Sequence, residues 1–258
     1  LTRPSMLVYR PAANATGTAV LVFPGGGYKA LGIGPQSTLG LYGSDVCKWL
    51  TDAGITCVLV KYRVPDTGCN WNPVTQRHEQ PAIPMALQDA QRAMALVRHH
   101  AQEWALDVHR IGVMGFSAGG HLAVQSSTAF ERRAYAPADA IDRVSVRPDF
   151  AIPVYPGHLT MEHHNVRPRD SAAGRALNTD IRIPSDAPPT LLVHARDDAV
   201  DPAYYSEVYA DALRAAGVPV TLRLYETGGH AFGVRLKGTD SDRWMQDALQ
   251  WLDDIGMR

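Results

Sequence analysis

Short apolar runs alternate with longer amphipathic stretches along almost the whole chain. Several of the runs are continuous rather than alternating, which is typical of strands that are buried on both faces of a sheet. The predicted strands are residues 6–10, 17–23, 56–62, 110–115, 150–155, 190–195 and 221–225. Strands that alternate with helical stretches indicate βαβ units and a mostly parallel sheet.

The amphipathic stretches predict five helices. The second repeats its apolar positions with a period close to 3.6, and the fourth begins after Asp201-Pro202, a capping residue followed by proline at a first helical position. The predicted helices are residues 44–53, 85–104, 118–128, 203–216 and 240–255. No internal repeat interrupts this pattern, so we expect one α/β domain over residues 1–258.

Two long stretches have no clear periodicity. Residues 64–84 are rich in Pro, Asn, Gln and Thr, and residues 157–189 are rich in Pro, His, Arg and Asp. Each follows a predicted strand and therefore lies at the edge of the sheet where α/β folds bind ligands. We expect both stretches to shape a pocket, with Trp71 as a candidate for its wall.

The composition is that of an ordinary globular protein. Hydrophobic residues make up 45% of the chain and charged residues 20%, and 25 basic and 26 acidic residues give a net charge of −1. This balance gives no reason to expect a nucleic-acid partner, and no apolar run approaches the length of a membrane span. The chain starts at Leu1 without a signal peptide; the compartment, cytoplasmic or exported, and the oligomeric state stay open.

Three cysteines are too few and too irregularly spaced for a disulfide framework or a zinc site. Cys47 lies in a predicted helix and Cys57 in a predicted strand, so we expect both to be buried free thiols, with a single structural pair as the alternative. Cys69 falls in a polar loop. The sequence around His158, His163 and His164 has no helical frame that would place metal ligands on one face, so we expect no metal and no cofactor.

The strongest chemical signal is the sequence Gly115-Phe-Ser117-Ala-Gly119. An apolar strand leads into it and a helix opens after it, which is the context in which a G-x-S-x-G serine becomes a nucleophile. Ser117 must adopt a strained conformation at a sharp turn, and glycines at 115 and 119 avoid collisions with the flanking strand and helix.

A nucleophilic serine needs a base, and His230 is the best candidate. It follows the strand predicted at residues 221–225 and lies among small residues, so its imidazole can reach the edge of the sheet. His121 competes by its closeness to Ser117 in sequence. However, it lies about one helical turn further on and is expected to point into the interface between helix and sheet as a buried hydrogen-bonding partner.

The base needs an acid to orient it, and the strand at residues 190–195 delivers two adjacent carboxylates to its carboxyl end. Neighbouring side chains diverge, so only one of Asp197 and Asp198 can face the histidine. The Asp-x-x-Val spacing to Val200 favours Asp197, with Asp198 as the alternative. The order Ser, Asp, His along the chain is that of the α/β hydrolases.

The sequence Phe23-Pro-Gly-Gly-Gly-Tyr28 supplies a candidate oxyanion hole. Glycines directly after a buried strand let backbone N–H groups approach a substrate, and Gly26 and Gly27, together with the amide of Ala118, are the expected donors. Tyr28 is a candidate for the border of the pocket. A phosphate-binding loop is the rival interpretation, but the lysine-serine ending and the G-x-G-x-x-G frame that it needs are absent.

These motifs together resemble the α/β-hydrolase superfamily, in the esterase/lipase branch with an HGGG-type motif. More narrowly, the chain is similar to bacterial acetyl xylan esterase-like and BD-FAE-like carboxylesterases. The matching stretches are residues 24–28, 60–65, 89–93, 110–123, 194–200 and 228–233. One departure is Pro24, which stands where the lipase-type motif has a histidine that braces the loop.

The resemblance implies an α/β-hydrolase fold, a mostly parallel central sheet with helices on both faces and loop insertions over the active site. It implies metal-independent hydrolysis of short-chain esters, often acetyl groups on xylan or other carbohydrates, so the expected partner is a small ester or an acetylated carbohydrate. The alternatives are a prolyl-oligopeptidase-type serine peptidase, whose relatives usually carry a propeller domain, and a catalytically silent binding protein of the same fold.

Overall fold

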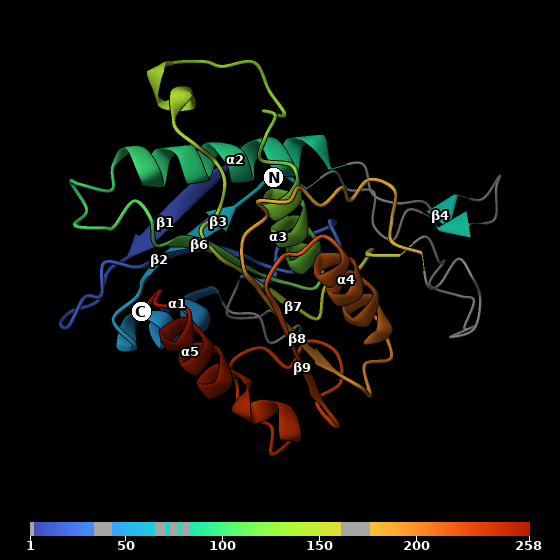
Figure 1. The fold of residues 1–258 in the computed structure, drawn as a ribbon. Helices are drawn as coiled ribbons and strands as arrows, with labels where there is room; N and C mark the ends of the chain where they lie inside the picture. The colour runs from blue at the N-terminus through green and yellow to red at the C-terminus, as the bar shows by residue number, and fades with distance from the viewer. Residues whose placement is uncertain (1–2, 34–42, 65–70, 73–76, 79–82, 161–175) are drawn as a thin grey trace.

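The computed structural model describes residues 3–33, 43–64, 71–72, 77–78, 83–160 and 176–258. A twisted sheet runs through the middle of the molecule, with strands in the order β1-β3-β2-β6-β7-β8-β9 (Figure 1). Its strands are β1 (Ser5–Tyr9), β2 (Ala19–Phe23), β3 (Thr56–Lys61), β6 (Ile111–Phe116), β7 (Ala151–Val154), β8 (Thr190–Ala195) and β9 (Val220–Tyr225). β1 is antiparallel to β3, and every other neighbouring pair is parallel.

Helices cover both faces of this sheet. They are α1 (Gly43–Asp52), α2 (Pro84–His99), α3 (Ala118–Thr128), α4 (Tyr204–Ala215) and α5 (Trp244–Asp254). One apolar core joins α1 and α5 to the sheet, and two others join α2, α3 and α4 to the opposite face. The expected α/β-hydrolase architecture is confirmed.

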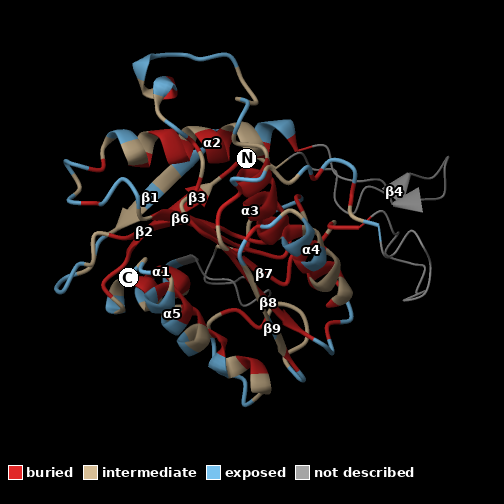
Figure 2. Ribbon diagram, in the orientation of Figure 1, coloured by how far each residue is buried: buried red, intermediate tan, exposed pale blue. Residues whose placement is uncertain are grey.

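The continuous apolar runs in the sequence are explained by the helices that cover both faces of the sheet. In β2, Val20 and Val22 belong to the core under α1 and α5, whereas Leu21 and Phe23 belong to the core under α2 and α3. Both sets are therefore buried, although successive side chains point to opposite faces. Figure 2 shows the same arrangement, with the central strands and α3 buried and the exposed residues gathered on outer helix faces and loops.

The predicted elements agree with the structure except at a few points. The second helix ends at His99 instead of residue 104, because the chain continues as turns up to Ala105, whose φ of 55° is incompatible with a helix. The last helix starts with a 3₁₀ turn, Asp240–Arg243. No sequence pattern predicted the 3₁₀ turn Ala140–Arg143 or the short pair β4 (Trp71–Asn72) and β5 (Arg77–His78).

Cys47 and Cys57 form a disulfide, so the expectation of two free thiols is wrong. A turn through Gly54, whose φ is 81°, folds β3 back against α1 and leaves the two Cα atoms 5.1 Å apart. Both side chains then lie in the same apolar core, fully buried. Cys69 lies outside the described residues.

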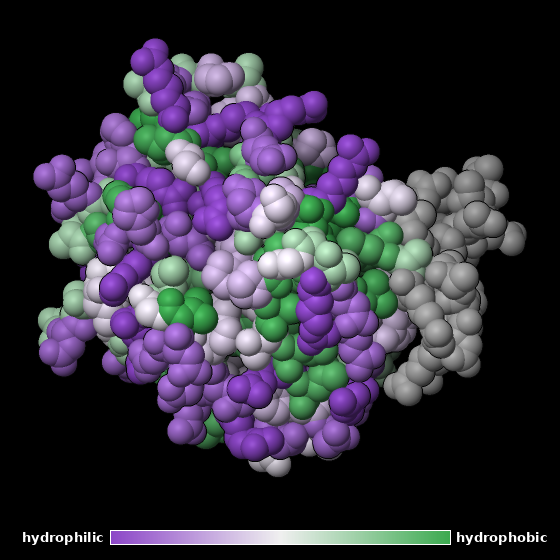
Figure 3. All heavy atoms as spheres, in the orientation of Figure 1, coloured by the Kyte–Doolittle hydropathy of each residue, from purple (hydrophilic) through white to green (hydrophobic). Residues whose placement is uncertain are grey.

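The surface seen in Figure 3 is hydrophilic over most of its area, with hydrophobic residues gathered beside α4 and next to the undescribed residues. Among the helices that the structure describes, none is long and apolar enough to cross a membrane.

Candidate active site

Ser117 occupies the sharp turn between β6 and α3, with φ 54° and ψ −119°. This left-handed conformation is uncommon for a residue with a side chain. Gly115 and Gly119 make the turn possible: a Cβ at 115 would lie 1.9 Å from the carbonyl oxygen of Gly119, and one at 119 would lie 2.1 Å from that of Phe23. The glycines are therefore required by close backbone contacts on both sides of the serine.

The structure brings Ser117 and His230 together from positions 113 residues apart. Nε2 of His230 lies 3.0 Å from Oγ of Ser117, and its Nδ1 lies 2.8 Å from Oδ2 of Asp198. A carboxylate only accepts, so Nδ1–H donates to Asp198, and Nε2 is left to accept the hydroxyl proton of Ser117. The three side chains form one continuous chain of hydrogen bonds.

The structure places Asp198 against the ring of His230, whereas the sequence favoured Asp197. After β8 the backbone makes a turn in which Asp198 N–H donates to Ala195 O at 3.2 Å. The turn directs Asp198 back into the interior and leaves Asp197 exposed. Asp197 instead accepts hydrogen bonds from the backbone N–H groups of Gly229, at 2.7 Å, and Gly228, at 3.3 Å.

Both carboxylates therefore hold the same histidine loop at different points. Asp197 binds the backbone just before His230, and Asp198 binds its ring. Oδ1 of Asp198 also accepts from the N–H groups of Val200 and Asp201, each at 2.9 Å. These bonds fix the carboxylate in one orientation, with Oδ2 directed to His230.

A second histidine contacts the same carboxylate oxygen of Asp198. His194 is fully buried in β8, and its Nε2 lies 3.4 Å from Oδ2 of Asp198 and 2.8 Å from the carbonyl oxygen of Asp201. Burial by itself would raise the pKa of Asp198, but the hydrogen bonds from His194 and His230 and their charges hold it far below the usual range. Asp198 is thus ionised at every pH at which His230 is neutral.

The pKa of His230 is raised above its ordinary value of 6.5. Burial opposes this shift, as does the positive charge of Lys237, but the hydrogen bond to Asp198 and the negative charges of Asp201 and Asp198 outweigh both. The imidazole is therefore a stronger base than a free histidine.

The expected oxyanion loop lies directly against the serine turn, since Gly119 is in close contact with the carbonyls of Phe23 and Pro24. Gly26 and Gly27 both have positive φ, 137° and 61°. The carbonyl of Gly26 accepts from the N–H groups of Lys29 and Ala30, which fixes the loop as a tight turn. Among the described residues, the N–H groups of Gly26, Gly27 and Ala118 have no backbone acceptor, as an oxyanion hole would need.

Tyr28, the candidate for the border of the pocket, lies in the interior of the described structure. Its positive φ of 57° turns the side chain inward, where it is fully buried, and its Oη lies 2.9 Å from Nδ1 of His121. His121 is the buried partner that the sequence predicted, and burial lowers its pKa to about 3. Tyr62 O–H donates to Pro24 O at 2.6 Å. The two tyrosines brace the loop that has no histidine at position 24.

The two predicted pocket loops are described only in part, because residues 65–70, 73–76, 79–82 and 161–175 lie outside the described residues. The backbone of Trp71 pairs with His78, but its side chain is not described, so its role as a pocket wall stays a prediction. His163 and His164 also lie outside. The ring of His158 packs against Tyr28 and His121.

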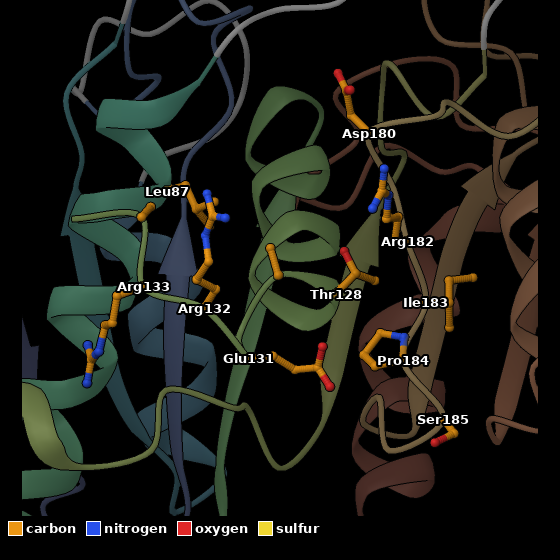
Figure 4. A pocket seen from close by; sticks show the side chains of 12 residues that line it. Leu87, Thr128, Glu131, Arg132, Arg133, Asp180, Arg182, Ile183, Pro184 and Ser185 are labelled. Atoms are coloured by element: carbon orange, nitrogen blue, oxygen red, sulfur yellow. The ribbon is translucent and has the colours of Figure 1, made fainter. Parts of the chain in front are cut away.

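A surface pocket of about 600 Å³ lies away from this chemistry (Figure 4). It surrounds the last turn of α3, where Arg132 and Arg182 stand on either side of the helix. Ser117 precedes the first turn of the same helix, so about 16 Å of helix separates the two ends. The pocket contains none of the residues that contact Ser117.

Two residues at the site were not predicted from the sequence. Asp201 was interpreted as a helix cap, but α4 begins at Tyr204 without a side-chain cap, and Oδ2 of Asp201 lies 3.8 Å from Nε2 of His230. Tyr155, at the end of β7, packs its ring against that of His230 with centroids 5.1 Å apart. The available signal was that Tyr155 directly follows a strand and that Asp201 lies in the loop after one.

Comparisons with known proteins identify a family and several relatives of this chain. The BD-FAE family matches residues 6–144. An acetylxylan esterase of Xylanibacter ruminicola is 29% identical, covering 98% of this chain and 48% of the relative; a probable carboxylic ester hydrolase, LipM, of Mycobacterium tuberculosis is 26% identical, covering 87% and 52%. The chain thus spans about half the length of these relatives.

Solved structures extend the comparison over the whole fold. The acetyl ester-xyloside bifunctional hydrolase of Caldicellulosiruptor lactoaceticus superposes with a TM-score of 0.77 at 29% identity, covering 98% of this chain and 89% of that one. Thermogutta terrifontis esterase 2 superposes with a TM-score of 0.73 at 23% identity, covering 98% and 90%, and supports the fold.

Proposed function

The chain belongs to the BD-FAE family, and on that premise we propose that it is a serine carboxylesterase that hydrolyses short-chain esters through an acyl-enzyme. The observation that carries the proposal is the unbroken chain of hydrogen bonds from Ser117 through His230 to Asp198, built on a strained turn. We assign the nucleophile to Ser117, the base to His230 and the orienting acid to Asp198.

In the first half-reaction Oγ of Ser117 attacks the ester carbonyl carbon and transfers its proton to Nε2 of His230. The carbonyl oxygen becomes an oxyanion that accepts from the N–H groups of Gly26, Gly27 and Ala118. When the C–O bond to the alcohol breaks, the imidazolium gives its proton to the leaving oxygen. Water then repeats the sequence on the acyl-Ser117 ester, releasing the acid and restoring the serine.

We further propose that the acyl group is small, acetyl above all, and that the natural substrate is an acetylated carbohydrate. Support comes from two similar proteins, an acetylxylan esterase and an acetyl ester-xyloside bifunctional hydrolase. Acetate release from acetylated xylan, measured beside simple acetyl esters and acetylated oligosaccharides, tests the carbohydrate. Faster hydrolysis of octanoyl than of acetyl p-nitrophenyl esters would refute the short acyl group.

Covalent labelling tests the enzyme class itself. A fluorophosphonate probe should modify the wild type with one equivalent and leave Ser117→Ala unmodified, since only an activated serine reacts. A folded wild type that resists the probe would favour the catalytically silent binding protein. Cleavage of prolyl peptides in preference to esters would favour the peptidase.

A further inference from the structure

Asp201 is a second buried carboxylate at the histidine. It follows Asp198 by three residues, only 4% of its surface is exposed, and its Oδ2 lies 3.8 Å from Nε2 of His230. Nε2 is the atom that takes and returns the proton of Ser117 in the proposed reaction, on which this inference rests. The two carboxylates therefore flank the imidazole, with Asp198 at Nδ1 and Asp201 on the side of Nε2.

Backbone contacts hold Asp201 in this position. Its own N–H donates to Oδ1 of Asp198 at 2.9 Å, and its carbonyl oxygen lies 2.8 Å from Nε2 of His194. Its carboxylate packs against Gly157, where a Cβ would lie 2.9 Å from both carboxylate oxygens. Glycine at 157 thus leaves the space that the carboxylate fills, and a side chain there would displace it.

Other groups face His230 from every element packed around it. Ser117 at the start of α3 is neutral, and burial raises the pKa of Tyr155 at the end of β7 well above its usual value, so that ring is neutral too. Lys237, in the loop after β9, is a cation whose Nζ donates to Ala231 O at 3.1 Å. The carboxylates of Asp198 and Asp201 oppose its effect on the imidazole.

We propose that Asp201 is a positioning residue for the proton transfer, whose negative charge stabilises the His230 imidazolium while Ser117 is attacking and while the alcohol is leaving. Asp198 orients the ring through Nδ1, and Asp201 acts at the opposite nitrogen. An opposite charge within about 4–6 Å favours the charged form of a histidine by about one pH unit or more.

The charge of Asp201 should shift the pH dependence of kcat/KM in a definite direction. His230 must be neutral to accept the serine proton, so kcat/KM falls as pH falls through the pKa of His230 in the free enzyme. The charge of Asp201 raises that pKa. Removing the charge should therefore move the acid limb to lower pH, and the less stabilised imidazolium should lower the plateau at high pH.

The test is the pH dependence of kcat/KM for an acetyl ester, from about pH 5 to about pH 9, in wild type and Asp201→Asn. We expect the acid limb of the variant to lie about one pH unit lower and its plateau to fall by about 10-fold, the rate equivalent of one pKa unit. Glu207→Gln is the matched control: it removes a half-buried carboxylate of α4, one that pairs with Arg196 at 3.5 Å, and should leave the acid limb unchanged.

A folded Asp201→Asn whose acid limb coincides with that of the wild type overturns the proposal, whatever happens to its plateau, because a merely structural role lowers the rate without moving the limb. If circular dichroism shows that this variant is unfolded, Asp201→Ser takes its place with the same expectation. NMR titration of the His230 ring in Ser117→Ala, with and without Asp201→Asn, measures the same shift without activity. This measurement separates failure of the Asp201 role from failure of the proposed esterase function.

Discussion

Asp198→Asn is the substitution that tests the candidate triad most directly. Asn has the same shape as Asp, and its carbonyl oxygen can keep accepting from the N–H groups of Val200 and Asp201, which now bind Oδ1 at 2.9 Å. That orientation places the amide NH₂ where Oδ2 faces Nδ1 of His230 at 2.8 Å. An NH₂ group only donates, so Nδ1 must become the acceptor and the ring proton moves to Nε2.

A proton on Nε2 faces Oγ of Ser117 at 3.0 Å and removes the base from the serine. Triads with this wrong tautomer lose about 10⁴-fold in kcat, or about 5.4 kcal/mol of transition-state stabilisation. The neighbouring Asp197→Asn should cost about 10-fold at most. It keeps an acceptor for Gly229 and loses the long bond to Gly228, and a single hydrogen bond contributes about 1 kcal/mol.

The assay is kcat on an acetyl ester for the two variants side by side, with fluorophosphonate labelling to count competent serines and urea unfolding to verify that each variant is folded. A loss near 10⁴-fold in Asp197→Asn, with Asp198→Asn close to wild type, would refute the assignment and restore the preference drawn from the sequence. Similar losses in both would mean that the histidine loop, rather than the tautomer, determines the rate.

Three further outcomes are expected. Gly119→Ala places a Cβ 2.1 Å from Phe23 O and should lower the free energy of unfolding in urea by about 1–3 kcal/mol and reduce activity, since the serine turn must move. Reduction of the Cys47–Cys57 disulfide, which joins residues 10 apart, should lower the same free energy by about 2.7 kcal/mol, measured with and without a phosphine reductant; an unchanged value contradicts it. Tyr62→Phe leaves Pro24 O without its donor and should cost about 1–3 kcal/mol in stability and reduce kcat, while KM changes little.

The fold and the strained turn at Ser117 could be predicted because they depend on local patterns. Continuous apolar runs give the buried parallel strands, and Gly115 and Gly119 are required by backbone contacts within the turn that they form. The position of His230 after the last strand was sufficient because all parallel strands deliver their carboxyl ends to one edge. The helix ends and the short β4–β5 pair depend on contacts elsewhere in the chain. The hydrophobic period of a local segment carries no information about such contacts.

The choice between Asp197 and Asp198 could not be made from a local pattern, because both carboxylates bind the loop that carries His230. One hydrogen bond, from Asp198 N–H to Ala195 O, fixes the turn in which the side chain of Asp198 points inward and that of Asp197 points outward. Residue spacing carries no information about that turn. The same turn brings Asp201, three residues later, beside Nε2 of His230, which is why a residue with the sequence signature of a helix cap lies at this histidine instead. At a strand end, therefore, an acidic cluster predicts that a carboxylate will reach the site, whereas the hydrogen bonds of the turn decide which carboxylate it is and how many arrive.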